Sequence, residues 1–230
     1  MLRTISVPGA IALLLSATTA QAGWYIGAGL GPDTVDFKQN GHVFQPGNFS
    51  VIDKTHLSST GIYATLFGGY GALVHNQWYL AGEVNGNISS TSFRSSNSEY
   101  VHSTFSNTKF KINNSVGISV LPGYQYSPGT LFYGRLGYQN GHFRSTTSDV
   151  SLANVSKREG GFRYGVGLKQ ALTPRLAVRM DYSRIDYSDI RFSTFDALST
   201  TTKNTIISPT QQLLEFGLVY SFDGVIAPEK

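Results

Sequence analysis

Eight stretches of this chain alternate apolar residues with small or polar residues at a period of two. This period is typical of β-strands, in which successive side chains point to opposite faces of a sheet. The stretches cover residues 23–30, 62–70, 78–88, 110–124, 132–138, 162–168, 176–182 and 214–222. Segments rich in turn-forming residues separate them, so the pattern predicts an all-β fold of antiparallel strands.

The composition favours a membrane location for these strands. Charged residues make up only 14% of the chain, whereas soluble domains contain about 25%. The chain has no cysteine, which excludes disulfides and thiolate metal sites. Beyond the first 22 residues no apolar run approaches the length of a spanning helix. A sheet can cross a bilayer only when it closes on itself, because every backbone polar group must be paired there.

The amino-terminal segment has the layout of a secretory signal peptide. Arg3 supplies a positive charge, residues 5–15 are apolar, and Ala20 and Ala22 are small residues at the positions that a signal peptidase reads. A membrane-spanning helix needs about 20 apolar residues, which this stretch does not provide. We therefore expect a signal peptide at 1–22, a β-barrel at 23–222 and a short periplasmic tail at 223–230.

The opposite faces of the strands carry glycines and small residues mixed with a few charges. In a narrow barrel of eight strands the lumen is just wide enough for side chains to fill it. Most of the charges fall at a similar distance from the predicted strand ends, which predicts an ion network inside the lumen. Its expected members are the carboxylates of Glu83, Asp181 and Glu215 and the guanidinium groups of Arg135, Arg163 and Arg179. The alternative is a soluble sheet whose charges face water.

The connections between the stretches alternate between short and long. Short links lie around 73–76, 127–130 and 173–175, and long ones cover 31–57, 89–109, 140–160 and 185–210. Outer-membrane barrels combine short periplasmic turns with long extracellular loops. The phase of this alternation predicts an up-and-down barrel of eight antiparallel strands with both termini in the periplasm. The long, hydroxyl-rich connections are expected to be mobile loops.

Three segments resemble the small outer-membrane barrels of Gram-negative bacteria, of the OmpA/OmpX type and the opacity-protein type. They are residues 23–29, which resemble the opening strand, 131–138, which resemble the fifth strand, and 215–222, which resemble the carboxy-terminal assembly signal. The resemblance implies that the barrel-assembly machinery recognises Glu215, Gly217, Tyr220 and Phe222. Two features depart from the pattern: residues 223–230 follow the signal, and Pro122 interrupts the fourth strand.

The sequence predicts a surface protein of the bacterial outer membrane that is not an enzyme. We expect a filled lumen, four extracellular loops for adhesion or envelope integrity, and no catalytic, cofactor or metal site. The histidines lie in predicted loops or turns, and no histidine is expected on the lipid-facing wall, where a lipid-A deacylase needs one. A lipid-A-modifying enzyme or protease and a small passive pore stay as alternatives.

The expected partners follow from this location. They are outer-membrane lipid and lipopolysaccharide, the barrel-assembly machinery, and a host surface ligand bound through the loops. The cationic residues are dispersed along the chain, so no nucleic-acid partner is expected.

Overall fold

The computed structural model describes residues 22–45, 47, 49–75, 77–97, 106–147, 155–196 and 201–223. All regular structure in this part of the chain is β. The strands are β1 (Gly23–Gln45), β2 (Phe49–His75), β3 (Trp78–Ser89), β4 (Ser92–Asn97), β5 (Ser106–Ser127), β6 (Thr130–Thr147), β7 (Val155–Ala171), β8 (Leu176–Tyr187), β9 (Ile190–Asp196) and β10 (Thr201–Ser221). The predicted signal peptide before Ala22 and the tail beyond Asp223 lie outside the described residues.

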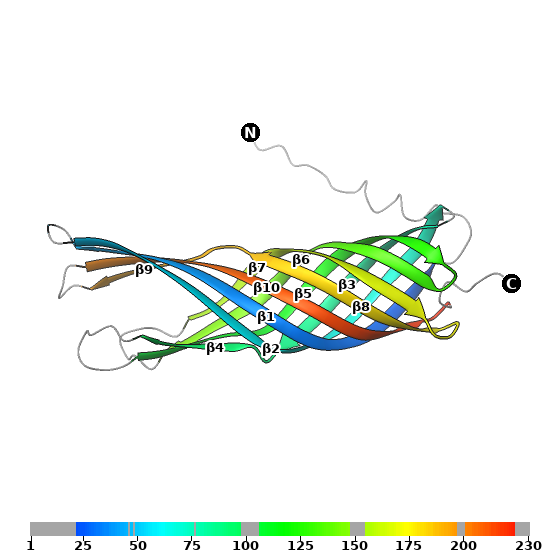
Figure 1. The fold of residues 1–230 in the computed structure, drawn as a ribbon, viewed down its shortest axis with the longest axis horizontal. Coiled ribbons are helices and arrows are strands. Elements are labelled where there is room, and N and C mark those ends of the chain that lie inside the picture. Colours follow the sequence, from blue (N-terminus) through cyan, green and yellow to red (C-terminus); the bar gives the residue numbers. More distant parts are fainter. Residues whose placement is uncertain are drawn as a thin grey trace, which may run out of the picture.

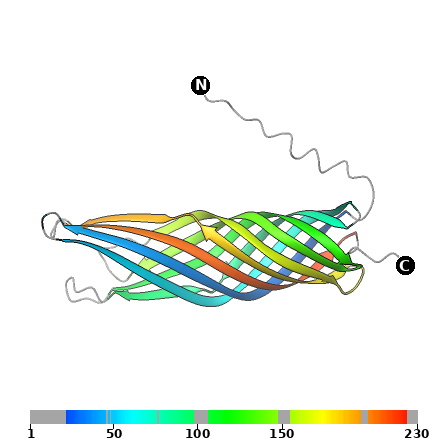
Figure 2. The same ribbon diagram turned by 45° about the horizontal axis from the view of Figure 1, so that its top comes forward.

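The strands form a single closed barrel (Figures 1 and 2). The strands pair antiparallel in the order β1-β2-β3-β5-β6-β7-β8-β10, and β1 pairs with β10, which closes the wall. Both β3 and β4 pair with β5, and both β8 and β9 pair with β10. Each of these two pairs therefore occupies one position in the wall. The predicted eight-stranded up-and-down barrel is confirmed, since the pairing of β1 with β10 removes the sheet edges along the barrel.

The two faces of the wall differ as the alternation predicts. Outward positions carry large apolar side chains that are exposed, such as Leu66, Val84 and Val166 at 62–70%. Aromatic residues border this apolar belt. Rings near the short turns include Trp24, Tyr70, Trp78, Tyr124, Tyr220 and Phe222, and those at the other border include Tyr138, Phe162, Tyr164 and Tyr182. An apolar band between two aromatic girdles is the outer surface of a membrane barrel. No helix long and apolar enough to cross a membrane occurs in the described part of the chain.

The strands are much longer than predicted. β1 has 23 residues and β2 has 27, whereas a tilted strand crosses a bilayer in about 9–11. Most of the predicted long loops are therefore strand, and the barrel extends far beyond its apolar belt (Figure 1). The prediction failed because outward residues turn polar where the wall leaves the membrane, while ladder pairing continues. Thr34, for example, pairs with Thr60 at the backbone, and the two hydroxyl groups lie 3.2 Å apart.

Two irregularities of β5 bear on the sequence predictions, and a further register shift lies between Gln125 and Ser127. The register between β5 and β6 shifts between Ile112 and Ser115, so Ile112 faces the lumen, where it is buried. Its prediction as an outward residue was wrong, because one extra residue at a bulge moves all side chains beyond it to the other face. Pro122 pairs with Leu80 of β3, while the β6 ladder passes from Val120 directly to Gly123. The proline lacks the N–H that this second ladder requires.

Candidate functional site

The six charged residues predicted for the lumen lie together there, and all are at most 5% exposed. They project from β3, β6, β7, β8 and β10. Arg135 donates to Glu83 and to Asp181, at 2.9 Å in each case. Arg179 donates to Glu83 at 2.6 Å and also pairs with Glu215. Arg163 is the most loosely held, 3.7 Å from Asp181.

Three tyrosines and one phenylalanine complete this ionic layer. Tyr25 donates to Glu83 at 3.1 Å, Tyr133 to Asp181 at 2.8 Å and Tyr63 to Glu215 at 3.5 Å. Every carboxylate of the layer therefore has both a guanidinium and a phenol partner. The Arg179 guanidinium also lies 3.4 Å from the ring centre of Phe67, a cation–π contact. Three negative and three positive charges cancel, so the buried layer is neutral.

Inward glycines make room for the tyrosine rings. A Cβ atom at Gly167 would collide with the ring of Tyr133, and one at Gly69 would collide with that of Tyr25. Gly167 lies between the outward residues Val166 and Leu168, and Gly69 lies between Gly68 and Tyr70. A residue with a side chain at either position would push the phenol away from its carboxylate.

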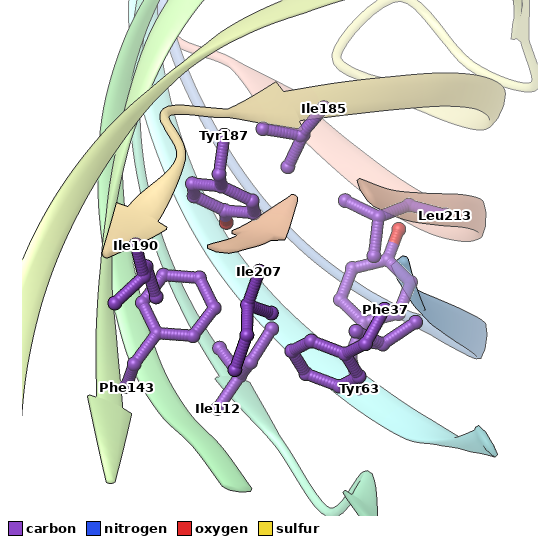
Figure 3. Close-up of a cluster of buried hydrophobic side chains, with 10 residues drawn as sticks. Phe37, Tyr63, Ile112, Phe143, Ile185, Tyr187, Ile190, Ile207 and Leu213 are labelled. Carbon is purple, nitrogen blue, oxygen red and sulfur yellow. The ribbon is translucent and has the colours of Figure 1, made fainter. Parts of the chain in front are cut away.

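Two apolar clusters enclose the ionic layer along the barrel axis. One lies toward the short turns and contains Tyr25, Phe67, Tyr79, Ala81, Leu121, Leu131, Tyr133, Ala177 and Val219. The other lies toward the extended end, where Phe37, Tyr63, Ile112, Phe143, Ile185, Tyr187, Ile190, Ile207 and Leu213 point toward one another (Figure 3). The second cluster was not predicted, because most of its members come from segments assigned to loops and Ile112 was assigned to an outward position.

A polar group centred on Asp33 lies next to the second cluster. The buried carboxylate of Asp33 accepts hydrogen bonds from Thr91 at 2.6 Å, Ser89 at 2.7 Å and Gln211 at 2.9 Å. A neighbouring cavity lined by Tyr63, Asn87 and Gln211 among others has a volume of only about 10 Å³, close to the space of one water molecule. The lumen is therefore packed with side chains at this level.

One histidine contradicts the prediction for the outer wall. His142 lies on β6 at an outward position, two outward positions beyond Tyr138. Its Nε2 is 2.7 Å from the hydroxyl of Ser156 on β7, and its Nδ1 is 3.3 Å from Oδ1 of Asn114 on β5. The prediction that no histidine occupies an outward strand position was wrong because the strands continue beyond the belt. His42, His56 and His75 also lie on strands, and His102 lies outside the described residues.

The residues of the predicted assembly signal divide between the two faces of β10. Glu215 and Gly217 face the lumen, and the side chains of Tyr220 and Phe222 face outward. The rings of Tyr220 and Phe222 meet edge to face at 5.5 Å, and the backbone N–H of Phe222 donates to Trp24. This end of the chain is therefore fastened to β1 at the closure of the barrel.

The chemistry of the ionic layer is that of a structural element. Its carboxylates are occupied by guanidinium and phenol donors, and apolar clusters separate it from either end of the barrel. Within the described residues, no three histidine, aspartate or glutamate side chains gather as they would around a metal ion.

The comparison with protein families agrees with this architecture. The model of the family described as the outer membrane protein beta-barrel domain matches residues 6–222. Among solved structures the chain is similar to OprG from Pseudomonas aeruginosa, at 17% identity and a TM-score of 0.48, covering 87% of this chain and 96% of that one. It is also similar to Ail from Yersinia pestis, at 17% identity and a TM-score of 0.37, covering 84% of this chain and 99% of that one. No curated protein matches the sequence.

Removal of one arginine tests how strongly the ionic layer stabilises the barrel. Arg179→Met leaves Glu215 buried without an ion-pair partner, whereas Glu83 keeps Arg135. Breaking a buried pair in this way costs about 3–5 kcal/mol of unfolding free energy. Adding Glu215→Gln removes the uncompensated charge, so the double variant should regain a large part of that loss. Urea unfolding in lipid vesicles, followed by tryptophan fluorescence, measures both.

The matched control is Arg184→Met, because Arg184 pairs with Asp186 at 2.9 Å but both side chains are more than 40% exposed. Exposed pairs contribute at most about 1 kcal/mol. Equal losses for Arg179→Met and Arg184→Met, or no recovery in the double variant, would show that the buried layer does not stabilise the fold.

Proposed function

Because this chain belongs to the outer membrane protein beta-barrel domain family of the bacterial outer membrane, we propose that it is a non-conducting surface scaffold. In this proposal the barrel anchors the protein and the extension beyond the belt makes contact with molecules outside the cell. The filled lumen is the observation that carries the proposal, because an ionic layer between two apolar clusters leaves the outer surface as the place for function.

The extension supports an interaction role by its shape and its surface. Short turns face the periplasm in proteins of this class, so the long strands extend outward from the cell. Near the tip formed by β1 and β2, the side chains of Phe44 and Ile52 are 44% and 67% exposed. They lie close together on the outer face, since His42 pairs with Ile52 and Phe44 with Ser50. Apolar side chains beyond the bilayer favour contact with another macromolecule or with envelope glycolipid.

Assembly and partners complete the proposal. The barrel-assembly machinery would recognise the chain through Glu215, Gly217, Tyr220 and Phe222, while lipopolysaccharide surrounds the wall. A host surface molecule would bind the extension in an adhesion role, and the same extension would contact the envelope in a stabilising role. Neither role requires nucleic acid or a cofactor.

Single-channel recording tests the non-conducting scaffold against the pore alternative. The refolded protein in a planar bilayer should give at most trace conductance, because side chains occupy the lumen over several layers. Large and steady current steps from the native protein would contradict the scaffold. The paired variant Phe67→Ala with Tyr133→Ala removes two large rings of one apolar cluster, and a rise in conductance confined to this variant would support the role of that cluster as a plug.

The outward hydrogen-bond chain favours a lipid hydrolase as a second candidate. With the proton on Nδ1, His142 would donate to Asn114 and accept from the hydroxyl of Ser156 at Nε2. Ser156 could then attack the carbonyl carbon of an acyl ester while His142 takes the hydroxyl proton, the relation of nucleophile and base in serine hydrolases. The side chains of this site are exposed on an open wall. For this reason the hydrolase ranks below the scaffold.

Ester hydrolysis tests this candidate. Under the scaffold proposal, purified protein in lipid A or phospholipid bilayers releases no fatty acid above the level of Ser156→Ala. Turnover that disappears in Ser156→Ala and in His142→Gln, with Ser188→Ala unchanged as the control, would replace the scaffold with an enzyme. Ser188 is another exposed serine near the same height of the wall, outside the hydrogen-bond chain.

A further inference from the structure

Basic side chains gather on one sector of the outer wall just beyond the apolar belt. Lys111 of β5 pairs with Arg144 of β6, and His142 of β6 pairs with Arg158 of β7. The alternation along each strand directs these four side chains outward. We propose that this group, called the basic patch, binds the phosphorylated headgroup of lipopolysaccharide in the outer leaflet. The inference concerns the membrane-facing wall and goes beyond the proposed contact role of the extension.

The cations of the basic patch have no acidic partners among the described residues. No carboxylate of the described chain lies within ion-pair distance of Lys111, Arg144 or Arg158, whereas two other cations nearby are paired. Lys157 contacts Glu159 at 2.5 Å, and Arg184 contacts Asp186 at 2.9 Å. The charges of the basic patch are thus free to meet an external anion. Guanidinium groups suit phosphate because their planar donors can engage two oxygens at once.

The height of the basic patch matches the headgroup layer. Tyr138 and Phe162, which pair with each other, mark the border of the belt on β6 and β7. Arg158 lies four residues beyond Phe162, which corresponds to about 13 Å along a strand and about 10 Å in height at a typical tilt. Long basic side chains can reach back toward the interface from there. A phosphate just outside the hydrocarbon core is therefore within reach of Arg158, and Arg144, six residues beyond Tyr138, lies about 5 Å higher.

The surroundings favour a lipid over a soluble anion. Below the basic patch the wall continues past Tyr138 and Phe162 as exposed Leu136, Ile118 and Val166. A ligand that covers both surfaces needs acyl chains joined to an anionic headgroup. The hydroxyl of Ser156 and the amide of Asn114 lie between the cations and can bind sugar hydroxyl groups. Lipopolysaccharide carries acyl chains, phosphates and sugars in this order from the membrane outward.

The neighbouring sector, from β8 through the β8–β9 link to β1, carries carboxylates beside its cations. The outward residues near the belt border on β8, the β8–β9 link and β1 include the acidic residues Asp186, Asp189 and Asp36. Asp189 accepts from Ser208, and Asp36 lies 3.4 Å from the amide of Gln212. Asp186 is neutralised by Arg184, whereas Asp189 and Asp36 have no cation within ion-pair distance among the described residues and disfavour phosphate beside them. Binding should therefore occur on the β5–β7 sector, with a fixed orientation of the lipid relative to the barrel.

The experiment measures lipid binding in nanodiscs of defined composition. The refolded protein is placed in phosphatidylcholine nanodiscs with increasing mole fractions of lipid A, and bound lipid A is counted by native mass spectrometry. In the double variant Arg144→Gln, Arg158→Gln, the mole fraction of lipid A at half-saturation should rise about ten- to thirty-fold. This is the effect expected for the loss of two cations at a charged lipid surface. Dephosphorylated lipid A should bind the native protein as weakly as lipid A binds this variant.

The matched control is Lys38→Gln with Lys54→Gln, which removes two exposed cations from the outer face of β1 and β2. It should bind lipid A like the native protein. The proposal fails if this control weakens binding as much as the arginine variant, or if dephosphorylated lipid A binds equally well. Displacement of lipid A by millimolar inorganic phosphate would assign the site to a free anion and would equally overturn the proposal.

Discussion

Six charged side chains buried in a narrow lumen are the part of this structure on which the rest depends. Removing a charge from water is costly, and only partners with good geometry offset that cost. Here Glu83 and Arg179 reach across the lumen from β3 and β8, while Tyr25 and Tyr63 bring β1 and β2 to the same layer. A shift in the register of any of these strands would leave a charge without its partner. The ionic layer thus both fixes the register of the strands and fills the lumen.

A filled lumen moves every possible activity to the outer surface. That surface has three zones: the apolar belt between its aromatic girdles, the basic patch next to the belt, and the extended strands with Phe44 and Ile52 near their tip. The backbone ladder runs through all three, since β1 and β2 pair from Gly23 with Gly71 to Gln45 with Phe49. Side chains beyond the belt are therefore held on a continuous sheet, which places them at defined heights above the membrane.

The features that the sequence could predict are those that depend on the alternation of apolar with small or polar residues inside the membrane. The eight strands, their faces and the membership of the ionic layer follow from apolar contrast, because residues such as Arg135 and Leu136 must point in opposite directions. The contrast fades where the wall meets water on its outer side, so the strand ends, Phe37 in the lumen and His142 on the wall were missed. Ile112 was misplaced because the bulge before Ser115 leaves no signal in a pattern of period two.

Closure of the wall between the first and last strands is tested most directly by a thiol cross-link, since the chain has no native cysteine. Ala28 and Leu218 are cross-strand neighbours on the outer face of β1 and β10, whereas Val178 lies one strand farther away, opposite Leu218. A short bifunctional thiol reagent should join Ala28→Cys to Leu218→Cys within one molecule of the folded protein, giving an altered mobility on a denaturing gel. Ala28→Cys with Val178→Cys should remain open. Absence of the first cross-link, or cross-links only between molecules, would contradict a closed barrel.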